Sequence, residues 1–224
     1  MGSELNEAED SEPVMRFYGV WLRPYLECDG DLPRDEWEAA TERLEQALDR
    51  HLEDLDDVTE AWGVKVPRNI LMLPFWHRLY PGLSFVHLVR NGLDMAYSKD
   101  RNQLRMVGDR LLTIEERRYP EPLQAIAYWQ RVNLMAAEYG ESRVGLRYLR
   151  LRFEDVCAHP TWAYEQLRGI AGARGVPVLP DVIATEVDRP RSIGRWRAHP
   201  RQEIEALSKV GAVGLRRFGY DERV

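Results

Sequence analysis

The sequence has little cysteine, no long apolar run and no secretion signal, and each absence excludes a class of protein. Its two cysteines, Cys28 and Cys157, are too few and too far apart for a metal site or a disulfide framework. No run approaches the ~18 apolar residues that a membrane span needs, and no basic-then-apolar segment opens the chain. We therefore expect a cytoplasmic protein with neither a membrane partner nor a metal.

Positive charge is also in short supply. The 224 residues include 31 lysines and arginines against 37 acidic residues, for a net charge of −6. This balance argues against a nucleic-acid partner, although basic residues can still gather around a smaller anionic ligand. The pattern G-x-x-x-x-G-K-[ST] is missing too, as is an obvious set of Mg²⁺ ligands, which disfavours a P-loop nucleotide kinase.

The most informative stretch runs from Leu83 to Arg105. A short, nearly continuous apolar run ends at Arg90, which predicts a parallel strand buried on both faces. Asn91-Gly92 is a turn dipeptide, and helical spacing follows it as far as Arg105. Arg90 is thus expected at the carboxyl end of a strand and Ser98 on the next helix, where open α/β sheets usually bind ligands.

Arg90 and Ser98 are suited to holding one phosphate group between them. The arginine offers a planar, permanently charged fork, and the serine a small hydroxyl that can donate to the same oxygens. In the alternative interpretation Arg90 pairs with Asp94, and Ser98 merely packs. The spacing of these residues favours neither interpretation over the other.

The remaining periodicity predicts an α/β fold in one domain, with a parallel sheet of four or five strands flanked by helices. A second strand over 146–153 is half-buried and ends at Glu154-Asp155, a pair that we expect to cap the next turn. The stretch 101–119 is dense in charge and predicts the end of a helix and an exposed loop. Helices are predicted over 14–26, 33–55, 70–80, 122–139, 160–173 and 202–218, and a short strand over 58–66.

Four ordered motifs resemble those of sulfotransferases that use 3'-phosphoadenosine 5'-phosphosulfate (PAPS). Arg90-Asn91, Asp94 and Ser98 match R-N-x-x-D-x-x-x-S in that family. The other similar segments are WGVKVPR at 62–68 (W-G-x-K-x-P), LRLRFEDV at 149–156 (a strand ending in [YF]-E-D), and SIGRWR at 192–197 (G-x-W-[RK]), followed by the common C-terminal G-Y at 219–220. Together they cover roughly 62–220, and such an ordered set is far less frequent by chance than any single motif.

The resemblance implies transfer of a sulfuryl group from PAPS to a hydroxyl or amine of a small-molecule or glycan acceptor, with no metal. In the family, the arginine and serine of the first motif hold the 3'-phosphate, and Arg90 and Ser98 stand at those positions. The lysine of K-x-P, here Lys65, can reach the sulfuryl group, where a fixed cation would offset charge that develops in the transition state. Its alternative is an ordinary surface lysine.

The stretch 188–200, DRPRSIGRWRAHP, holds four arginines within nine residues. Family members close this loop over the 3'-phosphate and the adenine. Arg189, Arg191 and Arg195 are therefore candidate ligands of the nucleotide, with Gly194 permitting close approach. The alternative is an exposed basic loop that pairs with the acidic N-terminal region.

One expected segment is missing from the sequence. The family normally begins with a strand and a loop of the form R-S-G-T or K-[ST]-G-T, which cradles the 5'-phosphosulfate. Nothing upstream of Trp62 has that form, so we expect the sequence to be N-terminally incomplete or the protein to have lost the loop. In the second case the domain would be a catalytically inactive module that binds a 3'-phosphonucleotide or has a regulatory role.

The architecture implied by the resemblance is that of the P-loop-containing nucleotide hydrolases. Residues 1–224 are expected to form a single sulfotransferase-like domain, with a helical acceptor-side region over 1–60 and a nucleotide-binding core over 61–224. The acidic start of the chain would then lie near the acceptor, where Glu7 or Asp10 could take the proton of an attacking hydroxyl. The alternative for this segment is a frayed tail.

Overall fold

The structure, a computed structural model, describes residues 12–53, 63–171 and 190–220. The chain divides into two compact units, Met1–Pro81 and Gly82–Val224, and each is described by itself. None of the helices in these described stretches has the length and apolar character needed to cross a membrane. The expectation of one sulfotransferase-like domain stays a prediction.

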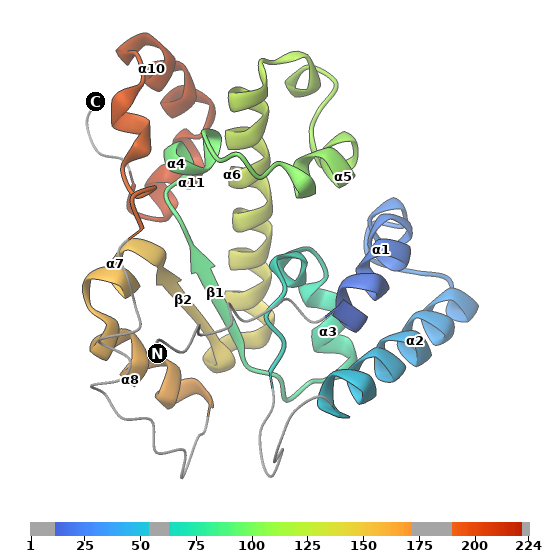
Figure 1. Cartoon of the computed structure of the whole chain (residues 1–224). Coiled ribbons are helices and arrows are strands. Elements are labelled where there is room, and N and C mark those ends of the chain that lie inside the picture. The colour runs from blue at the N-terminus through green and yellow to red at the C-terminus, as the bar shows by residue number, and fades with distance from the viewer. Residues whose placement is uncertain (1–11, 54–62, 172–189, 221–224) are drawn as a thin grey trace, which may run out of the picture. The chain divides into compact units, whose positions relative to one another are not determined.

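The N-terminal unit is helical in its described part (Figure 1). It contains α1 (Glu12–Glu27), α2 (Arg34–Glu53), the 3-10 turn η1 (Pro67–Leu71) and α3 (Leu73–Leu79), which confirms the helices predicted there. Asp29 and Gly30 turn the chain between α1 and α2 with φ of 49° and 85°, as expected for a turn of this composition.

Aromatic rings form much of the core of the N-terminal unit. Phe75 of α3 lies at the centre, with its ring centroid 4.5 Å from that of Trp37, 5.9 Å from Phe17 and 6.0 Å from Tyr25. These residues recur on the apolar faces of amphipathic helices, so the periodicity that predicted the helices also selected their buried faces.

The C-terminal unit is built on a parallel strand pair (Figure 1). Strand β1 (Phe85–Val89) pairs with β2 (Tyr148–Arg152), with Val89 opposite Arg152. The described residues thus confirm an α/β arrangement, but they hold a two-stranded sheet rather than the four or five strands expected. The prediction that β1 is buried on both faces is also wrong, since Val86 and Leu88 are 40% and 48% exposed. A continuous apolar run cannot distinguish a strand covered on both faces from one with an uncovered face.

Helices account for the rest of the C-terminal unit. The long helix α6 carries Ile126 and Trp129 into a core that also takes in Val89, Leu93 and Leu215. The helical elements are α4 (Gly92–Ala96), α5 (Asn102–Leu111), η2 (Glu116–Arg118), α6 (Glu121–Tyr139), η3 (Gly140–Val144), η4 (Gly145–Arg147), α7 (Phe153–Ala158), α8 (Pro160–Ala171), η5 (Arg195–Ala198), α10 (Arg201–Val210) and α11 (Ala212–Arg217).

Two of these elements differ from the sequence prediction for reasons of packing. Helix α5 forms where a charged loop was expected, because Val107 and Leu111 give it a buried stripe. The predicted final helix is divided at Gly211, where a Cβ would lie 2.6 Å from a side-chain atom of Ile126. Helix α6 ends at Tyr139 with Gly140 as its C-cap, as predicted; Gly140 also begins the π-helical turn η3, and its missing Cβ leaves room for the ring of Tyr148.

Candidate functional site

Arg90 lies immediately after β1, as the sequence predicts. Its Nη2 donates to the hydroxyl of Ser192 over 2.5 Å, and its Cζ lies 4.9 Å from the ring centroid of Phe153. Its Nε–H is buried and has no hydrogen-bond partner within the described stretches. A partly buried guanidinium with a buried Nε–H that makes no hydrogen bond is suited to an anionic ligand, because leaving such a donor unpaired is unfavourable.

The carbonyl of Arg90 is also held in place. Trp129 of α6 donates its indole N–H to this oxygen over 3.0 Å. The ring lies so close to the start of α4 that a Cβ on Gly92 would come within 2.6 Å of it. The Asn-Gly turn after β1 therefore needs its glycine for close packing.

Asp94 of the R-N-x-x-D-x-x-x-S motif, the first motif, contacts the stretch 190–200, which we call the late loop. It is 1% exposed, and its carboxylate accepts from the backbone amide of Gly194 over 2.7 Å and from that of Trp196 over 3.2 Å. The interpretation in which Asp94 pairs with Arg90 is therefore wrong. The carboxylate instead supplies the charge that two amides at the start of η5 need, since helical first turns have free N–H groups.

Ser98 does not lie on a helix. Helix α4 ends at Ala96, and the guanidinium of Arg101 donates to the carbonyls of Met95 and Ala96 over 2.9 and 2.5 Å. The hydroxyl of Ser98 accepts from the amide of Asp100 over 3.3 Å. Local bonds of this kind compete with continued helix and explain why the predicted helix breaks here.

The late loop contains three of the predicted nucleotide ligands within the described residues. Gly194 adopts the left-handed conformation with φ of 78°, and a Cβ there would lie 2.7 Å from the guanidinium of Arg197. Arg195 donates to the carbonyl of Ser192 over 3.2 Å and to that of Tyr97 over 3.3 Å, so it fastens the loop to the segment after α4. Arg191 is exposed.

The predicted site residues Arg189, Glu7 and Asp10 lie outside the described residues, so the structure does not test their roles.

An aromatic contact also joins the late loop to the residue after α4. The ring of His199 stacks on that of Tyr97 at 3.4 Å between centroids. Burial and the adjacent carboxylate of Glu203 raise the pKa of Tyr97 to about 12, so its hydroxyl stays neutral and donates to Glu203.

Glu154 fixes the end of β1 from the side of β2. Its carboxylate accepts from the backbone amide of Asn91 over 3.0 Å and from the hydroxyl of Tyr220 over 2.5 Å, and Tyr220 also contacts the carbonyl of Val89. Glu154 is therefore structural, as expected, but it binds the neighbouring strand end rather than the next turn. Burial and the carboxylate of Glu154 raise the pKa of Tyr220, which keeps its hydroxyl a donor.

Lys65 lies in the N-terminal unit on an irregular segment just before η1, and its side chain is exposed. The segment is held by a chain of neutral hydrogen bonds. Trp76 donates to the hydroxyl of Tyr18 over 2.6 Å, Tyr18 donates to the Oδ1 of Asn69 over 2.5 Å, and the Nδ2 of Asn69 donates to the carbonyl of Val64 over 2.9 Å. The backbone next to Lys65 is thus fixed from the core of its unit.

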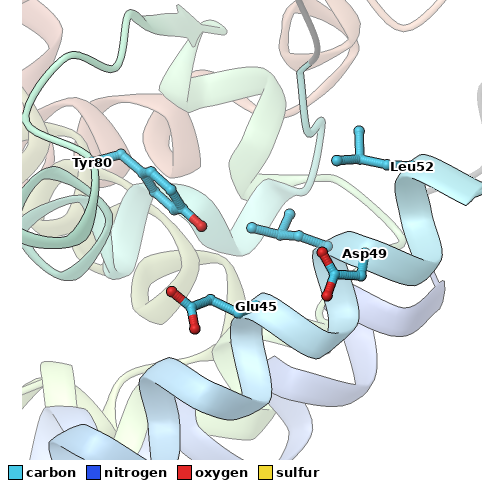
Figure 2. A pocket seen from close by; sticks show the side chains of 5 residues that line it. Glu45, Asp49, Leu52 and Tyr80 are labelled. Atoms are coloured by element: carbon cyan, nitrogen blue, oxygen red, sulfur yellow. The ribbon is translucent and has the colours of Figure 1, made fainter.

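The N-terminal unit also has a cavity of about 370 Å³ (Figure 2). Glu45 and Asp49 of α2 point toward it together with Tyr80, and Leu48 and Leu52 complete its lining. Burial and the two carboxylates raise the pKa of Tyr80. Because this lining is acidic and apolar, the cavity is unsuited to a phosphate or a phosphosulfate.

The sequence motifs do not reveal several of these structural roles. Asp94 and Glu154 both stand within the recognised motifs, and Tyr220 ends the C-terminal G-Y, but their partners come from distant parts of the chain. Ser192 belongs to the G-x-W-[RK] segment, and the family resemblance assigns it no role. In the sequence, the only indication that these residues have a structural role is therefore their position inside a motif.

Comparison with known proteins now identifies the family. A model of the sulfotransferase family matches residues 8–179. The chain belongs to the sulfotransferase family. Neither the curated proteins nor the solved structures yield a match. The late loop lies beyond the matched range, and its connection to the family's first motif is supplied by the contacts that Arg90 and Asp94 make with it. No group of metal-ligating side chains occurs in the part of this sulfotransferase that the structure describes.

Proposed function

We propose that this protein binds a 3'-phosphonucleotide at the carboxyl end of β1 and transfers the sulfuryl group of PAPS to a hydroxyl or amine acceptor. The observation that supports it best is the buried Nε–H of Arg90, which has no partner within the described stretches, in a member of the sulfotransferase family. An anion placed against this guanidinium would supply the missing acceptor.

The geometry favours side chains over backbone amides as the phosphate ligands. Asp94 already engages the amides of Gly194 and Trp196, so these donors serve to hold the loop. The guanidinium of Arg90 and the hydroxyl of Ser192 lie together at the loop's start. Ser98 and the exposed Arg191 remain candidates for the same phosphate, and Phe153 beside Arg90 offers a ring face on which a nucleobase can stack.

PAPS supplies an activated sulfuryl group when it is bound. In the proposed reaction Lys65 places its ammonium group near the charge that develops as this group is transferred, and the Asn69 chain keeps its backbone in place. The proton of the attacking hydroxyl goes to a base, for which Glu7 and Asp10 remain the candidates. The acceptor is proposed to be a small molecule or a glycan in the cytoplasm.

Calorimetry with two nucleotides tests the binding site. Adenosine 3',5'-bisphosphate should bind more tightly than AMP, because only the former has the 3'-phosphate that Arg90 addresses. Arg90→Ala should reduce this preference by about tenfold, the loss of one charge-assisted contact. Arg118→Ala removes an exposed arginine of η2 as the matched control. Equal affinity for the two nucleotides in the unmodified protein would refute the assignment.

A second candidate function, a module that binds nucleotide without turnover, is favoured by the lack of an R-S-G-T or K-[ST]-G-T stretch before Trp62. In the family that loop supplies most donors to the 5'-phosphosulfate, and removing a single such donor can lower a rate ~100 to 1000-fold. If this second function holds, the 224-residue chain should show negligible transfer from radiolabelled PAPS to a panel of hydroxyl acceptors. Robust transfer would refute the binding-module function and require another segment to perform the loop's role.

A further inference from the structure

A basic pocket lies beside β2 in the C-terminal unit. Its volume is about 220 Å³, and its lining includes Arg150 and Arg152 of β2, Trp162 of α8, and Arg217 and Phe218 at the end of α11. Val89 of β1, Leu151 of β2 and Asp155 of α7 complete its lining. Figure 1 shows α7 and α8 beside β2 on this side of the sheet.

The pocket has an excess of positive charge. Glu141 pairs with both Arg150 and Arg217, and Asp155 lies 3.8 Å from Arg152. Glu154 also favours the charged form of Arg152, but the residues that line the pocket include three arginines and a single carboxylate, that of Asp155. Because each pair is partly exposed and one carboxylate is shared, the arginines retain donors for another acceptor.

Arg152 supplies an independent sign of an unmet acceptor. Its buried Nε–H lies 3.8 Å from Oδ2 of Asp155, its ion-pair partner, and makes no hydrogen bond among residues 12–53, 63–171 and 190–220. Its guanidinium lies 4.4 Å from the ring centroid of Tyr220, which fixes its plane. A planar guanidinium held in a fixed orientation is the arrangement that binds tetrahedral oxyanions well.

The walls of the pocket are aromatic as well as basic. Trp162 is 45% exposed, which is unusual for so large an apolar ring, and Phe218 is buried beneath Arg150 with 5.5 Å between its centroid and the guanidinium carbon. A cavity of about 220 Å³ is smaller than the ~300 Å³ of the smallest drug-sized sites, so its ligand should be small.

We propose that this pocket binds a sulfate or phosphate monoester of a single ring, with the anionic group among Arg150, Arg152 and Arg217 and the ring against Trp162. Arg90 and Ser192 of the proposed nucleotide site do not line this pocket, whereas Val89, the residue before Arg90, does. The proposal rests on the pocket's own contacts and does not require sulfuryl transfer. Both esters share the tetrahedral oxyanion, and they differ in charge.

Calorimetry with phenyl sulfate, phenyl phosphate and inorganic sulfate tests the proposal. Arg217→Gln should weaken the binding of phenyl sulfate at least about tenfold, because one charge-assisted hydrogen bond is lost. Arg216→Gln removes the same charge from an adjacent, exposed position outside the pocket and should change affinity less than about twofold. Arg150→Gln provides a second pocket variant if the first one folds poorly by circular dichroism.

Two further comparisons locate the ligand. Trp162→Ala should weaken phenyl sulfate while leaving inorganic sulfate within about twofold, because only the former has a ring to stack. Arg90→Ala should leave phenyl sulfate affinity unchanged, whereas it should weaken adenosine 3',5'-bisphosphate. Tighter binding of phenyl phosphate than of phenyl sulfate would identify the dianion as the preferred group.

Several results would overturn the proposal. Absence of phenyl ester binding at millimolar concentration would show that the pocket is not a ligand site. Equal losses in Arg217→Gln and Arg216→Gln would show that only general surface charge matters. Loss of phenyl sulfate binding in Arg90→Ala would place the ester at the nucleotide site instead, and would leave the proposed function untouched.

Discussion

Two irregular segments of this protein carry predicted site residues, and they are held by different chemistry. In the late loop, the buried carboxylate of Asp94 accepts the amides of Gly194 and Trp196. In the segment before η1, the neutral side chain of Asn69 donates to the carbonyl of Val64. The first arrangement depends on one charged residue, whereas the second spreads over a chain of neutral groups.

This difference shows what each segment leaves available for a ligand. Asp94 consumes backbone donors of the late loop, so a phosphate there must be bound mainly by side chains such as Arg90. The neutral chain beneath Lys65 engages a carbonyl and leaves the lysine exposed. The difference between the two segments also predicts that removing the charged side chain of Asp94 lowers the free energy of unfolding more than removing one side chain of the neutral chain.

The largest effect is expected for Asp94→Ala. This change leaves two amides without their acceptor, at about 2 kcal/mol each, so the free energy of unfolding should fall by about 4 kcal/mol. Urea denaturation measures the loss. Asp100→Ala is the matched control, because Asp100 accepts one exposed amide, that of Asn102, and should cost less than about 1 kcal/mol. Similar losses in both variants would show that Asp94 is not a special anchor.

A second chain of neutral hydrogen bonds joins Tyr148, His87 and Asn133 at β1. Because His87 is titratable, the stability of a neutral chain can be tested by changing the pH. Asn133 donates to the carbonyl of Trp129, so its Oδ1 accepts from the Nε2 of His87, and Tyr148 donates to the Nδ1. Burial lowers the pKa of His87 from 6.5 to about 4, and nearby Arg150 acts in the same direction. The chain thus requires a neutral imidazole.

Acid should therefore weaken this neutral chain. Because the folded pKa of His87 lies below the unfolded value of 6.5, its stabilising contribution is complete above pH 6.5 and is lost as the pH falls toward 4. The loss approaches about 3 kcal/mol at low pH, from ~1.4 kcal/mol for each pKa unit. Urea denaturation at pH 7, 6, 5 and 4 measures it. His87→Gln should make the free energy of unfolding less dependent on pH. An unchanged pH dependence in that variant would assign the effect to other groups.

A smaller loss is expected when one link of the chain beneath Lys65 is cut. Tyr18→Phe removes the hydroxyl between Trp76 and Asn69, and the buried indole N–H then lacks its partner, at a cost of about 2 kcal/mol. A double-mutant cycle with Asn69→Ala should give a coupling energy of about 1 kcal/mol, since the two side chains share a hydrogen bond. Additive losses would mean that the chain does not act as a unit.

The parts of the site that the sequence predicted are the local ones. The apolar run and the Asn-Gly turn are adjacent in sequence, so they located Arg90 at a strand end. The partners of Asp94 and Glu154 are distant in sequence, and no periodicity reports which loop returns to which strand. Family resemblance supplied the late loop as a neighbour of Arg90, while the atoms that join them needed the structure.

The errors in the fold have the same origin. Helical spacing continued through Ser98, but Arg101 binds the last carbonyls of α4 and ends that helix, a contact that spacing alone does not encode. The number of strands was taken from the expected architecture rather than from counted apolar runs. Helix α5 was missed because its buried stripe is narrow and its sequence is rich in charge.

Ser98→Ala is expected to have the smallest effect on stability and gives the finest test of the site. Its hydroxyl accepts one amide in a short turn, so the free energy of unfolding should change by less than about 0.5 kcal/mol. If Ser98 also donates to the 3'-phosphate, its removal should weaken adenosine 3',5'-bisphosphate by about tenfold in calorimetry and leave AMP unchanged. Ser98→Thr keeps the hydroxyl and should retain most of the affinity. Unchanged affinity in Ser98→Ala would remove this residue from the site and leave Arg90 and the late loop as the only side-chain ligands that the proposal requires.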